Sequence, residues 1–290
     1  MTRYYKVAEH IFGIEADEKY FAQLTNYAPF ITDEIDPTHV FIIHVKTDSI
    51  PSTEGWQHLY TDRSDEDMPR IELYRRDTDW LFLTSMWRES EIVSAMRCSA
   101  DWKQVNVYMK TDNARFAIDN AAMLVYAFAT AGMQTLLFHS SVTVLNNKGY
   151  MFLGHSGTGK STHSRQWKEA FPECELLNDD NPVVRVWPDK SVRVYGSPWS
   201  GKTPCYKNDS APVQALVQLA QAPENKIARL KMTQAYPYIL ASVSGLKVMP
   251  EMMDQIFESI ANLLEISPVY RLECLPNPDA ARLCAQTGSL

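Results

Sequence analysis

One stretch, Gly154–Thr162, constrains what this 290-residue chain can fold into. It reads Gly-His-Ser-Gly-Thr-Gly-Lys-Ser-Thr and fits G-x-x-x-x-G-K-[ST], the phosphate-binding loop. Glycines at the bends let successive backbone N–H groups turn inward and bind phosphate oxygens. An apolar run precedes the motif and a stretch with helical spacing follows it, so the anion is expected at a helix N-terminus. The motif therefore predicts a strand–loop–helix that binds a nucleoside triphosphate.

The polar residues of the motif have expected roles. Lys160 is expected to reach the β- and γ-phosphates, and the Ser161 hydroxyl to ligate Mg²⁺. ATP and Mg²⁺ are therefore the predicted cofactors. The residues expected to bind the nucleotide are Gly154, Ser156, Gly157, Thr158, Gly159, Lys160, Ser161 and Thr162. The alternative is a glycine-rich turn with an incidental lysine.

The composition limits the partners and the compartment. A net charge of −7 and the lack of a basic run argue against a nucleic-acid surface. Five scattered cysteines without a C-x-x-C pair indicate neither a disulfide framework nor a zinc site, so a reducing cytoplasm is expected. Residues 120–147 contain no charged side chain, but polar residues and Gly132 interrupt them. We interpret them as a buried helix followed by a buried strand, and expect no membrane partner.

The order of apolar patterns predicts two domains. Residues 1–112 are expected to form a β-rich accessory domain, and residues 113–290 a catalytic domain. In the first, strands are expected at 3–14, 40–46, 71–75, 80–85 and 105–109. In the second, an apolar pattern predicts a buried helix over 114–134. The predicted fold class is therefore α/β, with a mixed (α+β) sheet.

A hairpin is expected immediately before the phosphate-binding loop. Strands are predicted at 136–144 and 150–153, and Asn146-Asn147-Lys148-Gly149 between them is typical of a tight turn. An ordinary phosphate-loop NTPase reaches its loop from a parallel strand. Here the preceding strand is expected to be antiparallel and adjacent.

Three further residues are catalytic candidates. Asp179 and Asp180 follow an apolar strand, and one carboxylate could take a proton from an attacking hydroxyl while the other serves the metal. Neighbouring side chains in a strand point to opposite sides, so a shared role requires a bend, which Asn181-Pro182 could supply. His139 could orient the base or polarise the acceptor. The alternatives are a polar turn for the acidic pair and a hydrogen-bonded core residue for the histidine.

Candidate substrate contacts lie further along the chain. The segment Gly196-Ser197-Pro198-Trp199-Ser200-Gly201-Lys202-Thr203 combines small residues, a donor-rich backbone and one cation. Such a loop suits an acceptor or an oxyanion, and an ordinary connection between strands is the alternative. The substrate-contacting candidates are Ser197, Trp199, Lys202 and Arg229.

Four segments then stand in one order: Phe138-His139-Ser140-Ser141, the phosphate-binding loop, Leu176-Leu177-Asn178-Asp179-Asp180, and Gly196–Lys202. Residues 135–230 thereby resemble the catalytic domain of HPr kinase/phosphorylase and its relatives in the phosphoenolpyruvate-carboxykinase-like superfamily. The resemblance implies a phosphate-loop kinase core of that type. It also implies that Asp179 is the base, in contact with His139, and that Asp180 lies near the metal.

The resemblance is to a divergent relative of the HPr enzyme. The Leu-Glu-Ile-Arg-Gly-type signature of that enzyme is replaced here by Tyr195–Lys202, which contains neither Glu nor Arg. Together these features predict an ATP- and Mg²⁺-dependent kinase that transfers the γ-phosphate to a hydroxyl acceptor, either a protein serine or a small molecule. Asp179, His139 and Lys160 are the expected catalytic residues, with Ser161 and Asp180 at the metal. An ATP-binding sensor without an acceptor, and an NTPase, are the alternatives; a homo-oligomer is left open.

Overall fold

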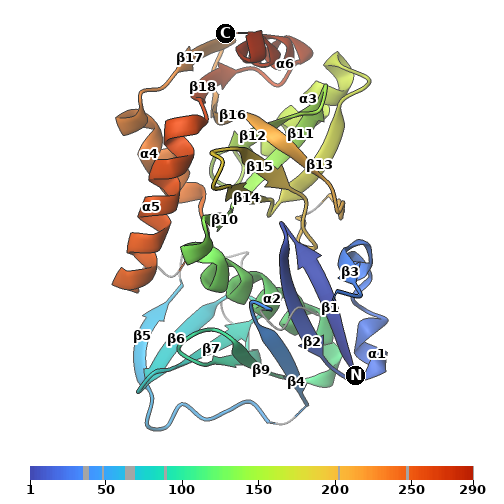
Figure 1. Ribbon diagram of the computed structural model, residues 1–290, viewed down its shortest axis with the longest axis vertical. Helices are drawn as coiled ribbons and strands as arrows, with labels where there is room; N and C mark the ends of the chain where they lie inside the picture. Colours follow the sequence, from blue (N-terminus) through green and yellow to red (C-terminus); the bar gives the residue numbers. More distant parts are fainter. Residues whose placement is uncertain are drawn as a thin grey trace. The chain divides into compact units, whose positions relative to one another are not determined.

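The computed structural model describes residues 1–34, 39–47, 49–62, 69–87, 90–201, 203–245 and 248–289 (Figure 1). Its contacts divide the chain into two compact units. Met1–Ala129 make up most of the first unit, and Thr130–Gly245 with Glu251–Leu290 make up the second. Lys202, one of the expected substrate contacts, lies outside the described residues.

The first unit is built on a nine-stranded sheet in the order β3-β1-β2-β4-β9-β8-β7-β6-β5. The strand β4 is parallel to both of its neighbours, and the other pairs are antiparallel. The strands are β1 (Thr2–Val7), β2 (His10–Glu15), β3 (Ile31–Thr32), β4 (Ile42–Lys46), β5 (Gln57–Thr61), β6 (Ile71–Arg76), β7 (Asp79–Ser85), β8 (Ile92–Cys98) and β9 (Gln104–Met109). Short helical segments lie at α1 (Glu18–Phe21), Thr25–Phe30 and Thr111–Asn113.

Residues 3–14 were expected to form a single strand, and they form the β1–β2 hairpin instead. Ala8 and Glu9 have φ of +48° and +65°, so the chain reverses at these two residues. In β1 the buried residues alternate with partly exposed ones towards its end, and in β2 every residue except the last is buried. A turn made by two residues outside the usual turn-forming types is not visible in the sequence pattern.

The apolar helix α2 (Ala114–Thr130) follows β9. Phe82 of β7 and Phe128 of α2 stack with ring centroids 5.7 Å apart, and the Tyr126 hydroxyl donates to the Val7 carbonyl at 2.9 Å. Counted with the 3₁₀ turn that continues it, Ala114–Met133 is long and apolar enough to cross a membrane by length and composition alone, and 56% of its most apolar window is buried within the protein. The buried helix predicted here is confirmed, and a cytoplasmic location stays a prediction.

The helix α2 also marks where the two units divide. The sequence places the boundary between residues 112 and 113, ahead of this helix. The contacts place the boundary between Ala129 and Thr130, because α2 packs with the strands of the first unit.

The second unit contains a mixed sheet in the order β10-β14-β15-β16-β12-β11-β13, with β18 beside β16 and β17 beside β18. The strand β12, which leads into the phosphate-binding motif, is antiparallel to β11 and parallel to β16. The hairpin predicted before the motif is therefore confirmed, and the two mixed sheets agree with the predicted α/β class. The strands are β10 (Thr135–Leu137), β11 (Ser140–Leu145), β12 (Lys148–Leu153), β13 (Glu175–Asp180), β14 (Val183–Val186), β15 (Val192–Tyr195), β16 (Ser210–Gln221), β17 (Lys226–Arg229) and β18 (Val269–Cys274).

Side chains cover β12 on both faces. Tyr150 and Phe152 contact the indole of Trp167, with ring centroids 4.5 and 5.6 Å apart, and Met151 and Leu153 on the other face are also completely buried. The helices around the sheet are α3 (Lys160–Ala170), α4 (Met232–Ser242), α5 (Pro250–Ile266) and α6 (Pro278–Ala285) (Figure 1). Because α3 is held against β12 by this aromatic contact, the loop that joins them has two fixed ends.

Candidate functional site

The phosphate-binding motif forms the strand–loop–helix that its sequence predicts. The strand β12 ends at Leu153, and α3 begins at Lys160 with Gly159 as its N-cap. Gly157 and Gly159 have φ of +78° and +105°, which residues with a side chain rarely adopt. The first backbone hydrogen bond of α3 runs from the His163 N–H to the Gly159 carbonyl at 2.8 Å, so the N–H groups before His163 have no acceptor within the helix and this end of α3 suits an anion.

The ammonium group of Lys160 lies at the centre of the site. Its Nζ donates to the carbonyls of Gly154 at 2.8 Å and His155 at 3.4 Å, and it lies 3.0 Å from Nε2 of His139. Burial lowers the pKa of Lys160, and the carboxylates of Asp180 and Asp179 oppose that shift. The Lys160 ammonium group is therefore a partly buried cation beside two carboxylates. It lies close enough to the loop to contact a ligand bound there.

His139 connects Lys160 to Asp180. Its Nδ1 lies 3.0 Å from Oδ1 of Asp180. Because an ammonium group can only donate, Nε2 of His139 accepts from Lys160, and Nδ1 therefore carries the proton that it donates to Asp180. The backbone N–H of His139 donates to the Ser242 carbonyl of α4 at 2.7 Å, which fixes the residue between β10 and β11. The strand predicted over 136–144 is thus broken at the histidine.

Asp179 faces the start of α3. Its Oδ1 accepts a hydrogen bond from the Ser161 hydroxyl at 3.0 Å, and its side chain is largely buried. Its backbone carbonyl accepts from the Gly201 N–H at 2.6 Å and from the Ser200 hydroxyl at 3.0 Å. These contacts hold Asp179 beside the first turn of α3.

The expected contact between His139 and Asp179 is wrong, because His139 pairs with Asp180. The two carboxylates are neighbours on β13, and neighbouring side chains of a strand point to opposite sides. Asp180 has φ of +131°, an unusual value for a residue with a side chain, and the Asn181 side-chain amide donates to its Oδ2 at 3.0 Å. Both carboxylates still lie beside the loop: Asp179 contacts Ser161, and Asp180 contacts His139.

Ser197 and Trp199, expected to touch substrate, are buried in the protein. The Ser197 hydroxyl donates to the Asn181 carbonyl at 2.5 Å and accepts from the Asn178 side-chain amide and the Trp199 N–H, both at 3.2 Å. Ser197 has no exposed surface, and Trp199 is 4% exposed. Both residues brace the segment that carries the acidic pair.

Substitution of Ser197 by alanine is expected to destabilise the protein by about 1–3 kcal/mol, because it leaves the Asn178 amide and the Asn181 carbonyl with fewer partners in a buried position. The measurement is the free energy of unfolding in urea. A change smaller than about 0.5 kcal/mol, the usual range for a surface substitution, would contradict this bracing role.

Arg229, the remaining expected substrate contact, lies away from the loop. It ends β17, which is separated from β12 by β18 and β16. It lines a different cavity, with Lys231 and the start of α4. The structure therefore does not bring Arg229 together with Lys160, His139 and the acidic pair.

A cavity of about 670 Å³ opens beside the phosphate-binding loop. Gly157, Thr158, Gly159, Thr162 and His163 form one side, and the ends of β16 and β18 form the other. The side from β16 and β18 consists of Leu219, Ala220, Gln221, Ala222, Cys274, Leu275 and Pro276. The volume is within the range of small-molecule sites, and most of the lining is apolar. The sequence predicts Gly157, Thr158, Gly159 and Thr162 as nucleotide-binding residues, but no local motif marks His163 or the residues from β16 and β18.

His163 occupies a buried position in the first turn of α3. Its Nε2 accepts a hydrogen bond from the Trp167 indole N–H at 3.0 Å, and its ring meets Phe152 edge-on at 4.6 Å. Burial lowers the pKa of His163 to about 4, so the ring is neutral at physiological pH. A neutral ring that accepts at Nε2 carries its proton on Nδ1, and the ring lines the cavity.

This histidine is expected to make stability fall in mild acid. In the unfolded chain the histidine has a pKa near 6.5 and is protonated below that pH. In the folded protein His163 becomes protonated only near pH 4. Stability is therefore lost as the pH falls from about 6.5 towards 4, by about 2 kcal/mol between pH 7 and pH 5. Urea unfolding at both pH values, compared with His163→Gln, isolates this contribution. An equal pH dependence in the two proteins would contradict it.

The oxygen atoms beside the loop suit a magnesium ion. Mg²⁺ takes oxygen ligands, commonly one or two from the protein, and water and substrate phosphates complete its shell. The Ser161 hydroxyl and the Asp179 carboxylate, 3.0 Å apart at the start of α3, supply two such oxygens. The structure thus pairs Ser161 with Asp179, where Ser161 and Asp180 were expected. Within the described ranges, no group of three or more His, Cys, Asp or Glu side chains is arranged to hold a metal by itself.

Comparison with known proteins finds a weak similarity to solved structures. A solved structure of the Hpr(Ser) kinase/phosphatase from Coxiella burnetii is similar at 10% sequence identity, with a TM-score of 0.31. The match covers 52% of this chain and 87% of that chain. No protein-family model and no curated protein matches the sequence.

Proposed function

We propose that this chain binds ATP with Mg²⁺ and transfers the γ-phosphate to a hydroxyl group of an acceptor. One observation carries the proposal: Lys160, His139 and Asp180 form a continuous hydrogen-bonded chain at the phosphate-binding loop. A cation that can neutralise phosphate and a carboxylate that can accept a proton thereby lie on two sides of one histidine. This arrangement has the parts that phosphoryl transfer to an alcohol requires.

Each part of the nucleotide has a matching surface. The loop N–H groups and Lys160 bind the β- and γ-phosphates, and the cavity beside the loop takes the nucleoside between Thr162 and the ends of β16 and β18. Ser161 and Asp179 hold Mg²⁺, which neutralises charge on the phosphate oxygens. The apolar lining of the cavity favours an uncharged base over water.

Asp180 is the better candidate for the base. A base must be reachable by the acceptor, and the side chain of Asp180 is 33% exposed, whereas Asp179 is 5% exposed. Asp180 takes the proton from the acceptor O–H while the oxygen forms a bond to the γ-phosphorus. The bond from that phosphorus to the β–γ bridging oxygen breaks, and ADP leaves. His139 holds the carboxylate in place through Nδ1–H. This allocation reverses the one expected from the sequence.

The test is ATP turnover with and without candidate acceptors, either free hydroxyl metabolites or small proteins that present serine. Formation of ADP that depends on an acceptor supports the proposal. A nucleotide sensor would be stabilised by ATP without forming ADP. An NTPase would form ADP and inorganic phosphate at a rate that no acceptor changes. Either of these outcomes would overturn the kinase assignment.

A further inference from the structure

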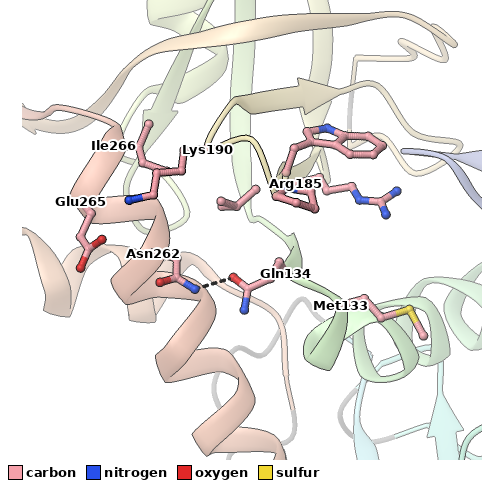
Figure 2. Close-up of a pocket in the computed structure, with 10 residues that line it drawn as sticks. Met133, Gln134, Arg185, Lys190, Asn262, Glu265 and Ile266 are labelled. Atoms are coloured by element: carbon pink, nitrogen blue, oxygen red, sulfur yellow. Dashed lines mark hydrogen bonds between the residues drawn. The ribbon is translucent and has the colours of Figure 1, made fainter.

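A second cavity in the same unit, of about 350 Å³, has a mostly apolar lining that includes three charged side chains, Arg185, Lys190 and Glu265 (Figure 2). Lys190 comes from the turn between β14 and β15, and Glu265 comes from the last turn of α5. Neither side chain has an ion-pair partner among the described residues. Because the guanidinium of Arg185 lies against the Trp187 ring, the solvent-exposed Lys190 ammonium group and Glu265 carboxylate are the two charges that the cavity offers to a ligand.

The cavity is held in shape by hydrogen bonds and a ring contact. The Asn262 side-chain amide donates to Oε1 of Gln134 at 2.9 Å, as the dashed line in Figure 2 shows. The guanidinium of Arg185 lies 4.0 Å from the ring centroid of Trp187, and the Trp187 indole N–H donates to the Tyr195 hydroxyl at 3.1 Å. The walls are therefore formed before any ligand enters.

The backbone at Lys190 is fixed as well. The Lys190 N–H donates to the Trp187 carbonyl at 2.9 Å, and the Trp187 N–H donates to the Ser191 carbonyl at 2.8 Å. Lys190 has φ of +64°, in the left-handed region that tight turns use. The opposite pole lies at the C-terminal end of α5, where unpaired carbonyls and the helix dipole add negative potential to that of Glu265.

From this arrangement we propose that the cavity binds a free α-amino acid with an apolar side chain. The ligand's carboxylate pairs with Lys190, and its ammonium group pairs with Glu265. Its side chain lies against the apolar surface formed by Met133, Trp187, Pro188 and Ile266. Two poles of opposite sign favour a zwitterion over a singly charged ligand, because either single charge leaves one pole unpaired.

The cavity is joined to the phosphate site by two short strands. At the cavity, the backbone N–H of Val186, the last residue of β14, donates to the Gln134 carbonyl at 2.9 Å. At the other end of the same strand pair, Phe138 donates to the Pro182 carbonyl at 3.0 Å, and the next residues are His139 and, on the other strand, Asn181 and Asp180. A ligand in the cavity therefore stabilises the strands that hold the His139–Asp180 pair. Control of phosphoryl transfer through these strands rests on the proposed function, whereas binding of the ligand does not.

The experiment is isothermal titration calorimetry of the full chain, without nucleotide, against L-leucine, L-methionine and L-phenylalanine at millimolar concentration. We expect one-to-one binding of at least one of them, weakened roughly tenfold or more in both Lys190→Gln and Glu265→Gln. Lys148→Gln and Glu258→Gln, exposed charges outside the cavity, serve as matched controls and should bind normally. The analogues of leucine that lack one charge, 3-methylbutan-1-amine and 4-methylpentanoic acid, should each bind at least tenfold more weakly than leucine.

A second measurement follows the strands. Hydrogen–deuterium exchange of peptides covering 134–140 and 182–187 should slow when the amino acid is bound.

Absence of binding by all three amino acids would overturn the proposal. Unchanged binding in both Lys190→Gln and Glu265→Gln would overturn the proposal too. So would an analogue that lacks one charge and binds as tightly as leucine. None of these readouts involves ATP, so their failure is separate from failure of the kinase assignment.

Discussion

Replacement of Asp180 by asparagine is expected to lower phosphoryl transfer about a thousandfold, while ATP still binds. General-base catalysis contributes about 10²–10⁴ in rate, and the asparagine amide keeps the shape of the carboxylate without its basicity. His139 can still donate to the remaining side-chain oxygen, so the geometry of the histidine is preserved. The measurement is the rate of ADP formation at saturating ATP and acceptor, together with the dissociation constant of ATP.

Two further variants make this prediction specific. Asp254→Asn removes an exposed carboxylate of α5 and should leave the rate unchanged. Asp179→Asn should raise the Mg²⁺ concentration needed for half-maximal activity, because the Asp179 carboxylate and the Ser161 hydroxyl together form the proposed Mg²⁺ site. If Asp179→Asn removes turnover at saturating Mg²⁺ while Asp180→Asn leaves it intact, the base is Asp179, as the sequence resemblance implies.

Replacement of Lys160 by alanine is expected to weaken ATP binding roughly ten- to a hundredfold, since a hydrogen bond to a charged group contributes about 1.5–3 kcal/mol. Phosphoryl transfer should fall further, by about 10²–10³, because the ammonium group also stabilises charge that develops on the migrating phosphoryl group. Both effects follow from one cation held over the loop by the Gly154 carbonyl and the His139 ring.

Lys148→Ala is the matched control for this lysine. Lys148 is exposed and lies at the opposite end of β12 from the loop. Thermal unfolding in the presence of ATP and Mg²⁺ reports nucleotide binding in both variants, since a ligand that binds only the folded state raises the unfolding temperature. An equal ATP-dependent rise in Lys160→Ala and in wild type would contradict the phosphate-binding role of the loop.

The loop itself could be predicted because its geometry is local. The φ values of Gly157 and Gly159 and the start of α3 depend on residues that are adjacent in sequence. The hairpin before the loop is local in the same sense, since the turn residues Asn146 and Asn147 adopt the left-handed φ that such turns require. For this reason the motif and its preceding hairpin both agree with the structure.

The partner of His139 could not be predicted, because it depends on the register between two strands. The pairing of β11 with β13 places Ser141 opposite Asp179 and Ser140 opposite Asp180, and this register shifts between Val142 and Thr143. A shift of one residue exchanges the two faces of a strand. No feature of the acidic pair itself encodes that irregularity.

The break at His139 and the cavity beside the loop are tertiary features. His139 donates its N–H to α4, a helix that contains Pro237 and therefore has a weak signal in the sequence. The cavity combines the loop with the ends of β16 and β18, which lie more than fifty residues away along the chain. Such residues become neighbours only when the sheet order is known.

The most direct measurement is the fate of the γ-phosphate. Wild-type protein is incubated with Mg²⁺ and ATP that carries an ¹⁸O-labelled γ-phosphate, in the presence of hydroxyl acceptors, and the products are analysed by mass spectrometry. The expected result is labelled phosphate esterified to an acceptor oxygen, formed at an initial rate that Asp180→Asn and Lys160→Ala each lower by about 10² or more and that Lys148→Ala preserves. Recovery of the label only in unchanged ATP, or only in inorganic phosphate, would contradict a kinase at this loop.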